Sequence, residues 1–235
     1  MTTSLSFVIP ALNPGDGLRR TLAALQDLAG PPEITEITEI AEIIVVDGGS
    51  VDGTPATAES LGARVLQAPA GRGGQLALGG GAAVGAWLLF LHADTVLAPS
   101  WRQAVTAFMK DPANRQRAAV FRFALDDPDP RARRVERLAG WRTRVLGLPY
   151  GDQGLLIHGD FYRRLGGYRA YPLMEDVDLV RRIGRKRIVC LPVTATTSAV
   201  RYRRDGWWLR PLRNLALLGL FALGVPPRLL THLYR

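Results

Sequence analysis

The sequence predicts an α/β protein with a Rossmann-like, open, mixed and mainly parallel sheet that carries helices on both faces. Short apolar runs end abruptly in polar residues, as Ile43–Val46 does before Asp47 and Leu88–Leu91 before His92. Such runs are typical of central strands that are covered on both sides. Stretches with helical spacing of apolar residues alternate with them. Because ligands gather at the carboxyl ends of parallel strands, the polar residues that follow the runs are the first site candidates.

Length and charge limit the possible classes of protein. A chain of 235 residues can bury one good-sized core, so we expect one domain over residues 1–206 and a C-terminal apolar and basic segment over 207–235. The formal net charge of +9 favours phosphate-rich ligands or anionic lipid. No base-stacking pattern or recognition-helix motif is present, so we expect no nucleic-acid partner.

The single cysteine and the start of the chain carry little functional signal. Cys190 excludes an internal disulfide and a cysteine-cluster metal site, and its strand-like run Ile188–Leu191 predicts a buried structural thiol. The residues Met1–Ser4 lack a basic region, so we expect no signal peptide and a cytoplasmic location.

The first elements lead to two polar turns. Leu5–Ile9 predicts a strand that stops at Pro10, and the turn Asn13–Gly17 enters a helix with Leu18, Leu22 and Leu25 on one face. A three-residue repeat over Glu33–Ile40 is interpreted as a loop or strand-entry extension without a catalytic role. After the strand Ile43–Val46, the glycines of the next turn let the backbone approach a ligand. Asp47 can accept hydrogen bonds from a base or ribose.

A glycine-rich stretch follows the predicted strand Arg64–Gln67. Gly71–Gln75 and Gly79–Gly81 offer flexible backbone beside a cation, and Arg72 can give paired donors to a diphosphate. A surface loop without a ligand is the alternative. The earlier turn, Asp47–Pro55, fits neither the dinucleotide fingerprint nor a P-loop.

The strand Leu88–Leu91 ends in two residues that can bind a metal, His92 and Asp94. These side chains stand where a parallel sheet binds its ligand. Alternatively, Asp94 only caps the next turn and His92 is a polar residue with its hydrogen bonds satisfied.

Four motifs in order carry a family resemblance. They are Phe7–Asn13, Val45–Thr54, Gly71–Gly73 and Phe90–Asp94. Together they resemble the nucleotide-sugar half of a family 2 glycosyltransferase with the GT-A fold, here residues 1–98, with an acceptor half over 99–206. The resemblance implies a nucleotide-sugar site made by Pro10, Asn13, Asp47, Gly49, Asp52, Arg72, His92 and Asp94. Asp47 would contact the base with help from Asp52, and Asp94 would bind a divalent metal.

His92 departs from the family pattern, which has an aspartate at this position. Histidine can donate to ribose or phosphate or can ligate a metal, and the sequence leaves these roles open. One acidic ligand suits Mg²⁺ or Mn²⁺, because these ions complete their shell with substrate phosphates and water.

The acceptor half begins with a predicted helix after Ser100 and a strand over Ala119–Leu125. Asp126–Pro130 is interpreted as a solvated turn rather than a metal cluster. An arginine-rich helix follows, with an apolar face made by Val135, Leu138, Trp141 and Val145. Its arginines are either solvated or contact anionic lipid or a phosphorylated acceptor.

Glu175 and Asp176 begin a predicted helix, where acidic residues can simply complement the helix dipole. The family resemblance implies that Asp176 is the base that deprotonates the acceptor hydroxyl, with Glu175 as its supporting neighbour and Asp178 as a weaker substitute. Attack opposite the leaving nucleotide would invert the anomeric centre.

Three further motifs, Gly151–Gln153, Gly166–Tyr168 and Pro172–Leu179, resemble a bacterial subgroup of transferases associated with radical-SAM and selenium-domain proteins. Within them, Asp152 and Gln153 are candidates for the acceptor side.

The C-terminal apolar run, Leu215–Val225, would reach only about 17 Å as a helix, too short to span a membrane. Trp207, Trp208 and nearby arginines fit a segment at the inner face of the cytoplasmic membrane, and packing onto the domain or into a homodimer fits equally well. Membrane contact would favour a lipid-linked acceptor.

The function predicted from these features is metal-dependent, inverting transfer of a sugar from a nucleoside diphosphate to a hydroxyl acceptor. Two alternatives stay open. One is a sugar-phosphate nucleotidyltransferase, and the other is a non-catalytic nucleotide-sugar-binding or membrane scaffold protein, for which His92 is the main argument.

Overall fold

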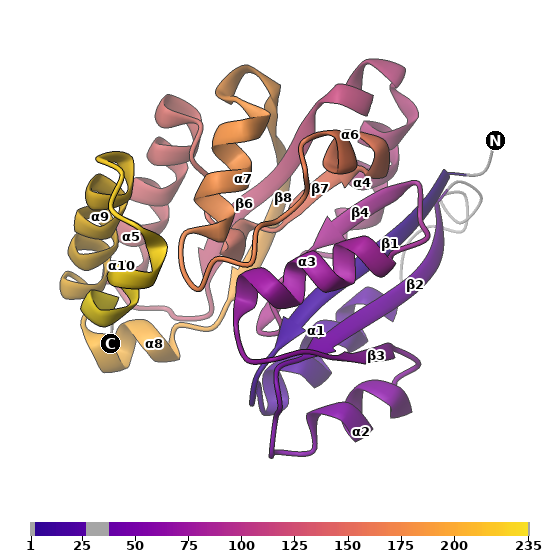
Figure 1. Cartoon of the computed structure of the whole chain (residues 1–235), viewed down its shortest axis with the longest axis horizontal. Coiled ribbons are helices and arrows are strands. Elements are labelled where there is room, and N and C mark those ends of the chain that lie inside the picture. Colours follow the sequence, from indigo (N-terminus) through magenta and orange to yellow (C-terminus); the bar gives the residue numbers. More distant parts are fainter. Residues whose placement is uncertain (1–2, 27–37, 235) are drawn as a thin grey trace.

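The computed structural model describes residues 3–26 and 38–234, and eight strands of these residues form one open sheet (Figure 1). The strand order is β3-β2-β1-β4-β7-β6-β8-β5. The strands are β1 (Thr3–Ala11), β2 (Thr38–Asp47), β3 (Arg64–Gln67), β4 (Trp87–Phe90), β5 (Thr95–Leu97), β6 (Ala118–Leu125), β7 (Leu155–His158) and β8 (Ile188–Thr197). β3, β2, β1 and β4 are mutually parallel, whereas β7 pairs antiparallel with both β4 and β6. The predicted mixed α/β sheet is therefore confirmed.

Helices cover both faces of the sheet, as predicted. The α-helices are α1 (Asp16–Gln26), α2 (Thr54–Ser60), α3 (Arg72–Ala82), α4 (Trp101–Lys110), α5 (Pro130–Trp141), α6 (Gly159–Arg164), α7 (Glu175–Ile183), α8 (Val200–Asp205), α9 (Leu209–Ala222) and α10 (Pro227–Tyr234). A π-helical turn, Arg142–Leu146, extends α5, and short 3₁₀ turns cover Pro112–Gln116, Gly151–Gln153 and Arg185–Arg187. The repeat predicted as a loop or extension lies mostly outside the described residues, and its last three residues are the first of β2.

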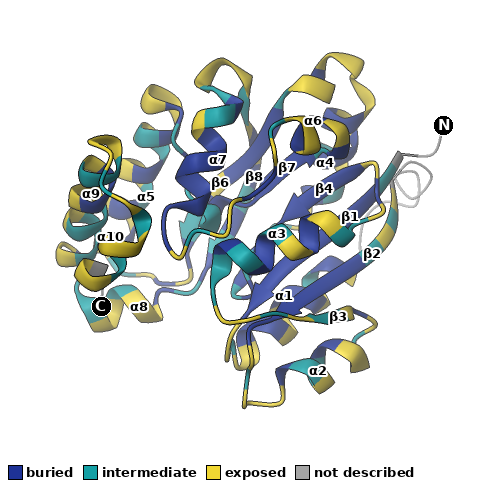
Figure 2. Ribbon diagram, in the orientation of Figure 1, coloured by how far each residue is buried: buried dark blue, intermediate teal, exposed yellow. Residues whose placement is uncertain are grey.

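The alternation of side chains along the central strands divides the core into two layers. On β1, Phe7 and Ile9 are in one cluster with α1 and α4, whereas Val8 faces the other cluster with α3, α6 and α7. All three side chains are fully buried, as are Leu88 and Leu89 on β4 (Figure 2). This two-sided burial explains why the strands read as continuous apolar runs.

The glycine-rich stretch is a helix, α3, and not a loop. A Cβ atom at Gly79 would lie 2.4 Å from Cγ1 of Val8, and one at Gly73 would lie 2.4 Å from the carbonyl oxygen of Tyr171. These glycines let α3 approach the sheet and the chain before α7. The run is therefore explained by packing, and Arg72 is the first residue of the helix.

Two predictions about side-chain burial were wrong. Cys190 is exposed because β8 alternates between a buried and an open face in this region. In the arginine-rich helix α5, Val135 is buried with Ala132 and Ala139, but Leu138 and Trp141 are each 52% exposed. The helix is rotated so that small residues face the sheet, and the large apolar side chains lie at the surface.

The C-terminal helices pack on the domain through one side only. Leu217, Leu218 and Leu230 are buried against Leu173 and Val177, next to the start of α7. No helix among the described residues is long and apolar enough to cross a membrane.

The first strand is longer than predicted. It was expected to stop at Pro10, but β1 continues through Pro10 to Ala11.

Candidate active site

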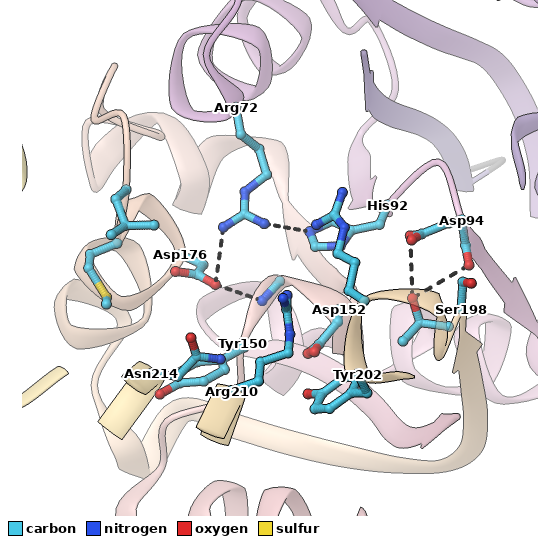
Figure 3. A pocket seen from close by; sticks show the side chains of 15 residues that line it. Arg72, His92, Asp94, Tyr150, Asp152, Asp176, Ser198, Tyr202, Arg210 and Asn214 are labelled. Carbon is cyan, nitrogen blue, oxygen red and sulfur yellow. Dashed lines mark hydrogen bonds and ion pairs between the residues drawn. The ribbon is translucent and has the colours of Figure 1, made fainter. Parts of the chain in front are cut away.

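A cavity of about 100 Å³ lies where the carboxyl end of β4, the start of α3, the start of α7 and the C-terminal helices meet (Figure 3). Its wall includes Arg72, His92, Asp94, Asp152 and Asp176. These predicted residues come from both halves of the chain, and the fold brings them around one space.

Arg72 is the link between the two halves. Its Nε donates to Oε1 of Glu175, and its Nη2 lies 4.0 Å from Oδ2 of Asp176. Its Nη1 lies 3.5 Å from Nε2 of His92. Figure 3 shows the guanidinium between the imidazole and the carboxylate of Asp176. One cation thus contacts the strand end on one side and the start of α7 on the other.

The start of α7 is held in an uncommon conformation. Met174, directly before the helix, has φ of 65°, a left-handed value that side-chain-bearing residues seldom adopt. Its side chain is buried with Leu217 and Leu218, and this packing keeps the strained residue in place. The helix then directs Glu175 and Asp176 inward, where Oδ2 of Asp176 accepts from the Gly151 amide at 2.8 Å.

Glu175 is 1% exposed, and its Oε2 is buried without a hydrogen-bond partner among the described residues. Burial raises the pKa of this carboxyl group, an effect that Arg72 opposes. A buried carboxylate fixed by an arginine is well placed to orient that arginine.

Asp152 lies in the cavity wall and is the second acid with a buried oxygen atom. Its Oδ1 is shielded from solvent and has no hydrogen-bond partner among the described residues. Burial raises the pKa of Asp152 to about 6, and the nearby Arg142 works against this shift. Arg142 itself stacks on Tyr150, with its Cζ 3.3 Å from the ring centroid, so its charge is shared with an aromatic face.

His92 is electrically neutral at physiological pH. Burial lowers its pKa well below the usual value, and the charges of Arg72 and Arg201 lower it further. Because Nε2 faces an N–H donor of Arg72, we assign the ring proton to Nδ1. Gly151 is needed beside it, since a Cβ atom there would lie 2.8 Å from Nε2 of His92.

The donor atoms of the cavity fit a divalent metal only in part. Asp94 accepts from Oγ1 of Thr197 at 3.3 Å, and Asp152 also lines the cavity, although its Oδ1 is shielded from solvent. The described residues include no cluster of three or more His, Cys, Asp or Glu side chains that could hold a metal. Mg²⁺ and Mn²⁺ accept such an incomplete set, because one or two carboxylates and substrate phosphates are enough.

The residues predicted to contact the nucleoside occupy loops at the ends of β1 and β2. Asp47 is 1% exposed, and its Oδ2 accepts from the amides of Gly49 at 3.1 Å and Ser50 at 3.0 Å. Asn13 joins the two loops through the Val51 amide at 2.9 Å, and Asp52 accepts from the Gly15 amide at 3.0 Å. These polar groups order the loops, and they do not line the cavity around Arg72.

Gln153 lies apart from the cavity. It is 1% exposed, accepts from Oγ1 of Thr143 at 2.8 Å and donates to the carbonyl of Phe121 at 2.9 Å. These contacts attach the 3₁₀ turn to β6 and leave no group for a ligand.

Four further residues of the cavity wall, near the C-terminus, were not predicted from the sequence: Arg201, Tyr202, Arg210 and Asn214. The available signal was Asn214, a neutral polar residue at the start of an otherwise apolar run. Arg210 donates to Asp205 at 2.8 Å, and burial raises the pKa of Tyr202 to about 12.

Comparisons with known proteins identify the family and the fold. The family model for glycosyl transferase family 2 matches residues 6–172, a range that includes Asp94 and Asp152 and ends shortly before Asp176. The chain has no match among curated protein sequences.

Three solved structures share the fold at low sequence identity. The mannosyltransferase PcManGT from Pyrobaculum calidifontis, in complex with GDP-Man and Mn²⁺, has a TM-score of 0.68 and 16% identity over 97% of this chain and 67% of its own. TarS 1-349 of S. aureus has a TM-score of 0.60 and 14% identity over 99% and 69%. GalNAc-T7 with UDP, GalNAc and Mn²⁺ has a TM-score of 0.58 and 16% identity over 83% and 43%. This chain therefore spans less than half of GalNAc-T7. All three similarities concern the fold.

Proposed function

The chain belongs to glycosyl transferase family 2 and is a glycosyltransferase, and we propose that it moves a sugar from a nucleoside diphosphate to a hydroxyl acceptor with inversion. The observation that carries this proposal is the position of Arg72 between the β4 end and Asp176. A diphosphate bound near Arg72 would place the anomeric carbon beside a carboxylate from the opposite half of the molecule.

The nucleoside would bind over the loops at the ends of β1 and β2, through Pro10, Asn13, Asp47, Gly49 and Asp52. Their hydrogen bonds within the protein support this role, because a loop that is ordered before binding loses less entropy when the ligand arrives. The solved mannosyltransferase with GDP-Man and GalNAc-T7 with UDP make a nucleotide-sugar donor the natural choice.

Asp176 would act as the general base. The acceptor oxygen would attack the anomeric carbon while the bond from that carbon to the diphosphate oxygen breaks, and the hydroxyl proton would pass to the carboxylate. Its Oδ2, next to Arg72, faces the cavity, and Glu175 holds the arginine from the buried side. Arg72 would stabilise the charge that develops on the leaving diphosphate.

Asp94 would hold a divalent ion, Mn²⁺ or Mg²⁺, together with the donor phosphates, and Asp152 would lie on the acceptor side near it. Such an ion acts as a Lewis acid that neutralises a leaving diphosphate. Two of the related structures contain Mn²⁺. For Gln153, predicted on the acceptor side, the hydrogen bonds with Thr143 and Phe121 support a structural role instead.

The test of the base is Asp176→Asn, which keeps the size of the side chain and removes its ability to accept a proton. We expect the turnover number for transfer to fall by about 10²–10⁴. The dissociation constant of the nucleoside should stay within about twofold, because its loops do not line the cavity around Asp176. Nucleotide-sugar turnover and nucleoside binding by calorimetry measure the two quantities.

Asp178→Asn is the matched control on the same helix. Asp178 is paired with Arg169 at 3.1 Å and with Arg182, so its loss should lower the melting temperature and leave turnover within a few fold. Full transfer activity in Asp176→Asn would show that another group is the base.

The predicted location at the inner membrane face and the predicted homodimer stay predictions.

A further inference from the structure

A second cavity adjoins the reaction cavity and is apolar. Its volume is about 230 Å³, and it runs between α5 with its π-helical extension and α9. Leu138, Trp141 and Leu146 form one wall, and Trp208, Leu212 and Leu215 form the other. We call this cavity the α5–α9 groove.

The groove leaves large apolar side chains in contact with solvent. Leu138, Trp141, Trp208, Leu212 and Leu215 are each more than half exposed. Single exposed leucines are common, but a contiguous apolar patch in a monomer marks a binding surface. These side chains also face a concave space, which a flat partner surface would not fill.

The groove shares part of its wall with the reaction cavity. Tyr150, Asp152, Tyr202 and Asn214 belong to the walls of both, and Figure 3 shows them along the side of the reaction cavity away from Arg72. Polarity therefore changes along one path, from the carboxylates near Arg72, through hydroxyl and amide groups, to tryptophan and leucine side chains. A ligand that matches this path is polar at one end and apolar at the other.

The position of the groove relates it to the acceptor. The nucleoside loops follow β1 and β2, which lie with α3 on one side of α7, whereas α5 and α9 lie on the other side of α7 (Figure 1). A molecule in the groove would thus approach Asp176 from the side opposite the donor.

We propose that the α5–α9 groove holds the apolar chain of an amphiphilic acceptor, whose hydroxyl group enters the reaction cavity through the passage lined by Tyr150 and Asn214. The placement of the hydroxyl end rests on the proposed function, whereas the placement of the apolar chain rests on the groove alone. An apolar cavity of about 150 Å³ binds a benzene-sized molecule, so a groove of about 230 Å³ has room for a longer hydrocarbon segment.

The binding test uses ω-bromoalkan-1-ols of six to twelve carbons as soluble probes. Bromine quenches tryptophan emission on contact, and Trp141 and Trp208 line the groove, whereas Trp87 and Trp101 are 2% exposed in the core. We expect saturable quenching with an affinity that rises about fourfold per methylene and then levels off when the groove is full.

Three variants make the test specific. Trp141→Phe combined with Trp208→Phe should abolish the saturable quenching. Leu212→Glu, in the groove wall, should weaken probe affinity by at least about tenfold, because a methylene chain would contact a charge. Leu209→Glu is the matched control, since Leu209 is 71% exposed on the same helix outside the groove, and it should change neither probe affinity nor nucleotide-sugar hydrolysis. Circular dichroism and thermal melts establish that each variant is folded.

Three results would overturn the proposal. Affinity that does not depend on chain length would mean that no hydrocarbon site exists. Quenching by brominated phospholipid in phosphatidylglycerol vesicles, without quenching by the soluble probes, would assign the surface to a membrane. A wild-type dimer in light scattering that Leu212→Glu dissociates would assign it to a second copy.

A second readout separates this inference from the proposed function. With a donor that the enzyme hydrolyses, long alkan-1-ols should be converted to alkyl glycosides, detected by mass, more efficiently than short ones. Hydrolysis without any alkyl glycoside would overturn the acceptor assignment and leave donor use intact. If no nucleotide sugar is turned over at all, the proposed function fails, and the quenching series still decides whether the groove binds a chain.

Discussion

Hydrogen bonding of polar side chains differs between two regions of the molecule. These are the loops at the ends of β1 and β2 and the surroundings of the reaction cavity. In the loops, the carboxylate of Asp47 accepts two backbone amides and Asn13 accepts a third. At the cavity, Oδ1 of Asp152, in the wall, and Oε2 of Glu175, which pairs with Arg72 behind the wall, are buried without hydrogen-bond partners among the described residues. One region has satisfied its polar groups within the protein, and the other keeps some of them unsatisfied.

The difference distinguishes polar groups that stabilise the fold from polar groups that destabilise it. Satisfied polar groups stabilise a loop that must keep its shape, whereas a buried, unpartnered acid lowers stability, a cost that is common at functional sites. Neutralising the acid should therefore stabilise the protein, and removing the loop carboxylate should destabilise it. Three predictions follow this contrast.

The largest expected effect is a gain in stability from Asp152→Asn. The pKa of Asp152 rises from 3.8 to about 6 on folding, so the folded state binds more protons than the unfolded state between these pH values. Wild-type stability should fall as pH rises through this window. Asparagine has no such charge, so the variant should be more stable at pH 8, by up to about 3 kcal/mol, and nearly equal to wild type below pH 4. Urea unfolding with a chelator present measures both limits.

Asp129→Asn is the control, because the pKa of Asp129 is shifted in the opposite direction to that of Asp152. The side-chain hydrogen bond from Arg131 lowers the pKa of this exposed carboxyl group, so its contribution to stability is present above pH 3.8 and is lost as pH falls. This variant should be no more stable than wild type at pH 8. If Asp152→Asn also fails to gain stability there, the buried acid is satisfied by water, and the contrast between the two regions disappears.

The next effect is a loss from Asp47→Ala in the loops. Removing the carboxylate leaves the amides of Gly49 and Ser50 without their acceptor, and we expect a loss of about 2 kcal/mol. Nucleotide affinity should fall with it, because the loop no longer holds its shape before binding. Asp47→Asn keeps one acceptor oxygen and should lose less than half as much. Unfolding and nucleotide titration of both variants decide this, and equal losses would mean that the acceptor oxygen is not what matters.

The sequence was sufficient for the central sheet because burial on both faces leaves a strong pattern. Phe7 and Leu89 lie among continuous apolar residues. The polar residues directly after such runs lie at the carboxyl ends of their strands, as predicted. The same local pattern failed for α5. Whether Leu138 and Trp141 face the sheet or the solvent depends on the small residues Ala132 and Ala139, which fit closely under the helix.

The cavity wall was less predictable because it depends on contacts between distant parts of the chain. Arg72 was expected to serve a phosphate, but its pairing with Glu175 joins residues 103 positions apart. Asn214 and Tyr202 enter the cavity only because the C-terminal helices pack beside α7, through contacts such as Leu217 with Val177. No spacing within one segment carries such information.

The smallest expected effect concerns His92, which stands between the two regions. Its neutral ring gives the cavity a polar group without charge, next to Arg72 and on the same wall as Asp94. His92→Asp would add a carboxylate there, and we expect Mn²⁺ affinity to rise by about tenfold, because charged oxygen ligands set the affinity of such sites. Calorimetric titration of Mn²⁺, with and without nucleoside diphosphate, measures this.

His92→Asn completes the test because it keeps a neutral polar side chain and removes the imidazole. Unchanged Mn²⁺ affinity in this variant would mean that His92 does not ligate the metal, and a loss would identify Nε2 as a ligand in place of its contact with Arg72. The donor specificity of His92→Asp then decides what the histidine does. If turnover and donor choice are preserved, histidine is a tolerated replacement for an acidic ligand. If the preferred nucleotide sugar changes, the neutral ring selects the donor, because it adds no carboxylate on the strand side of Arg72.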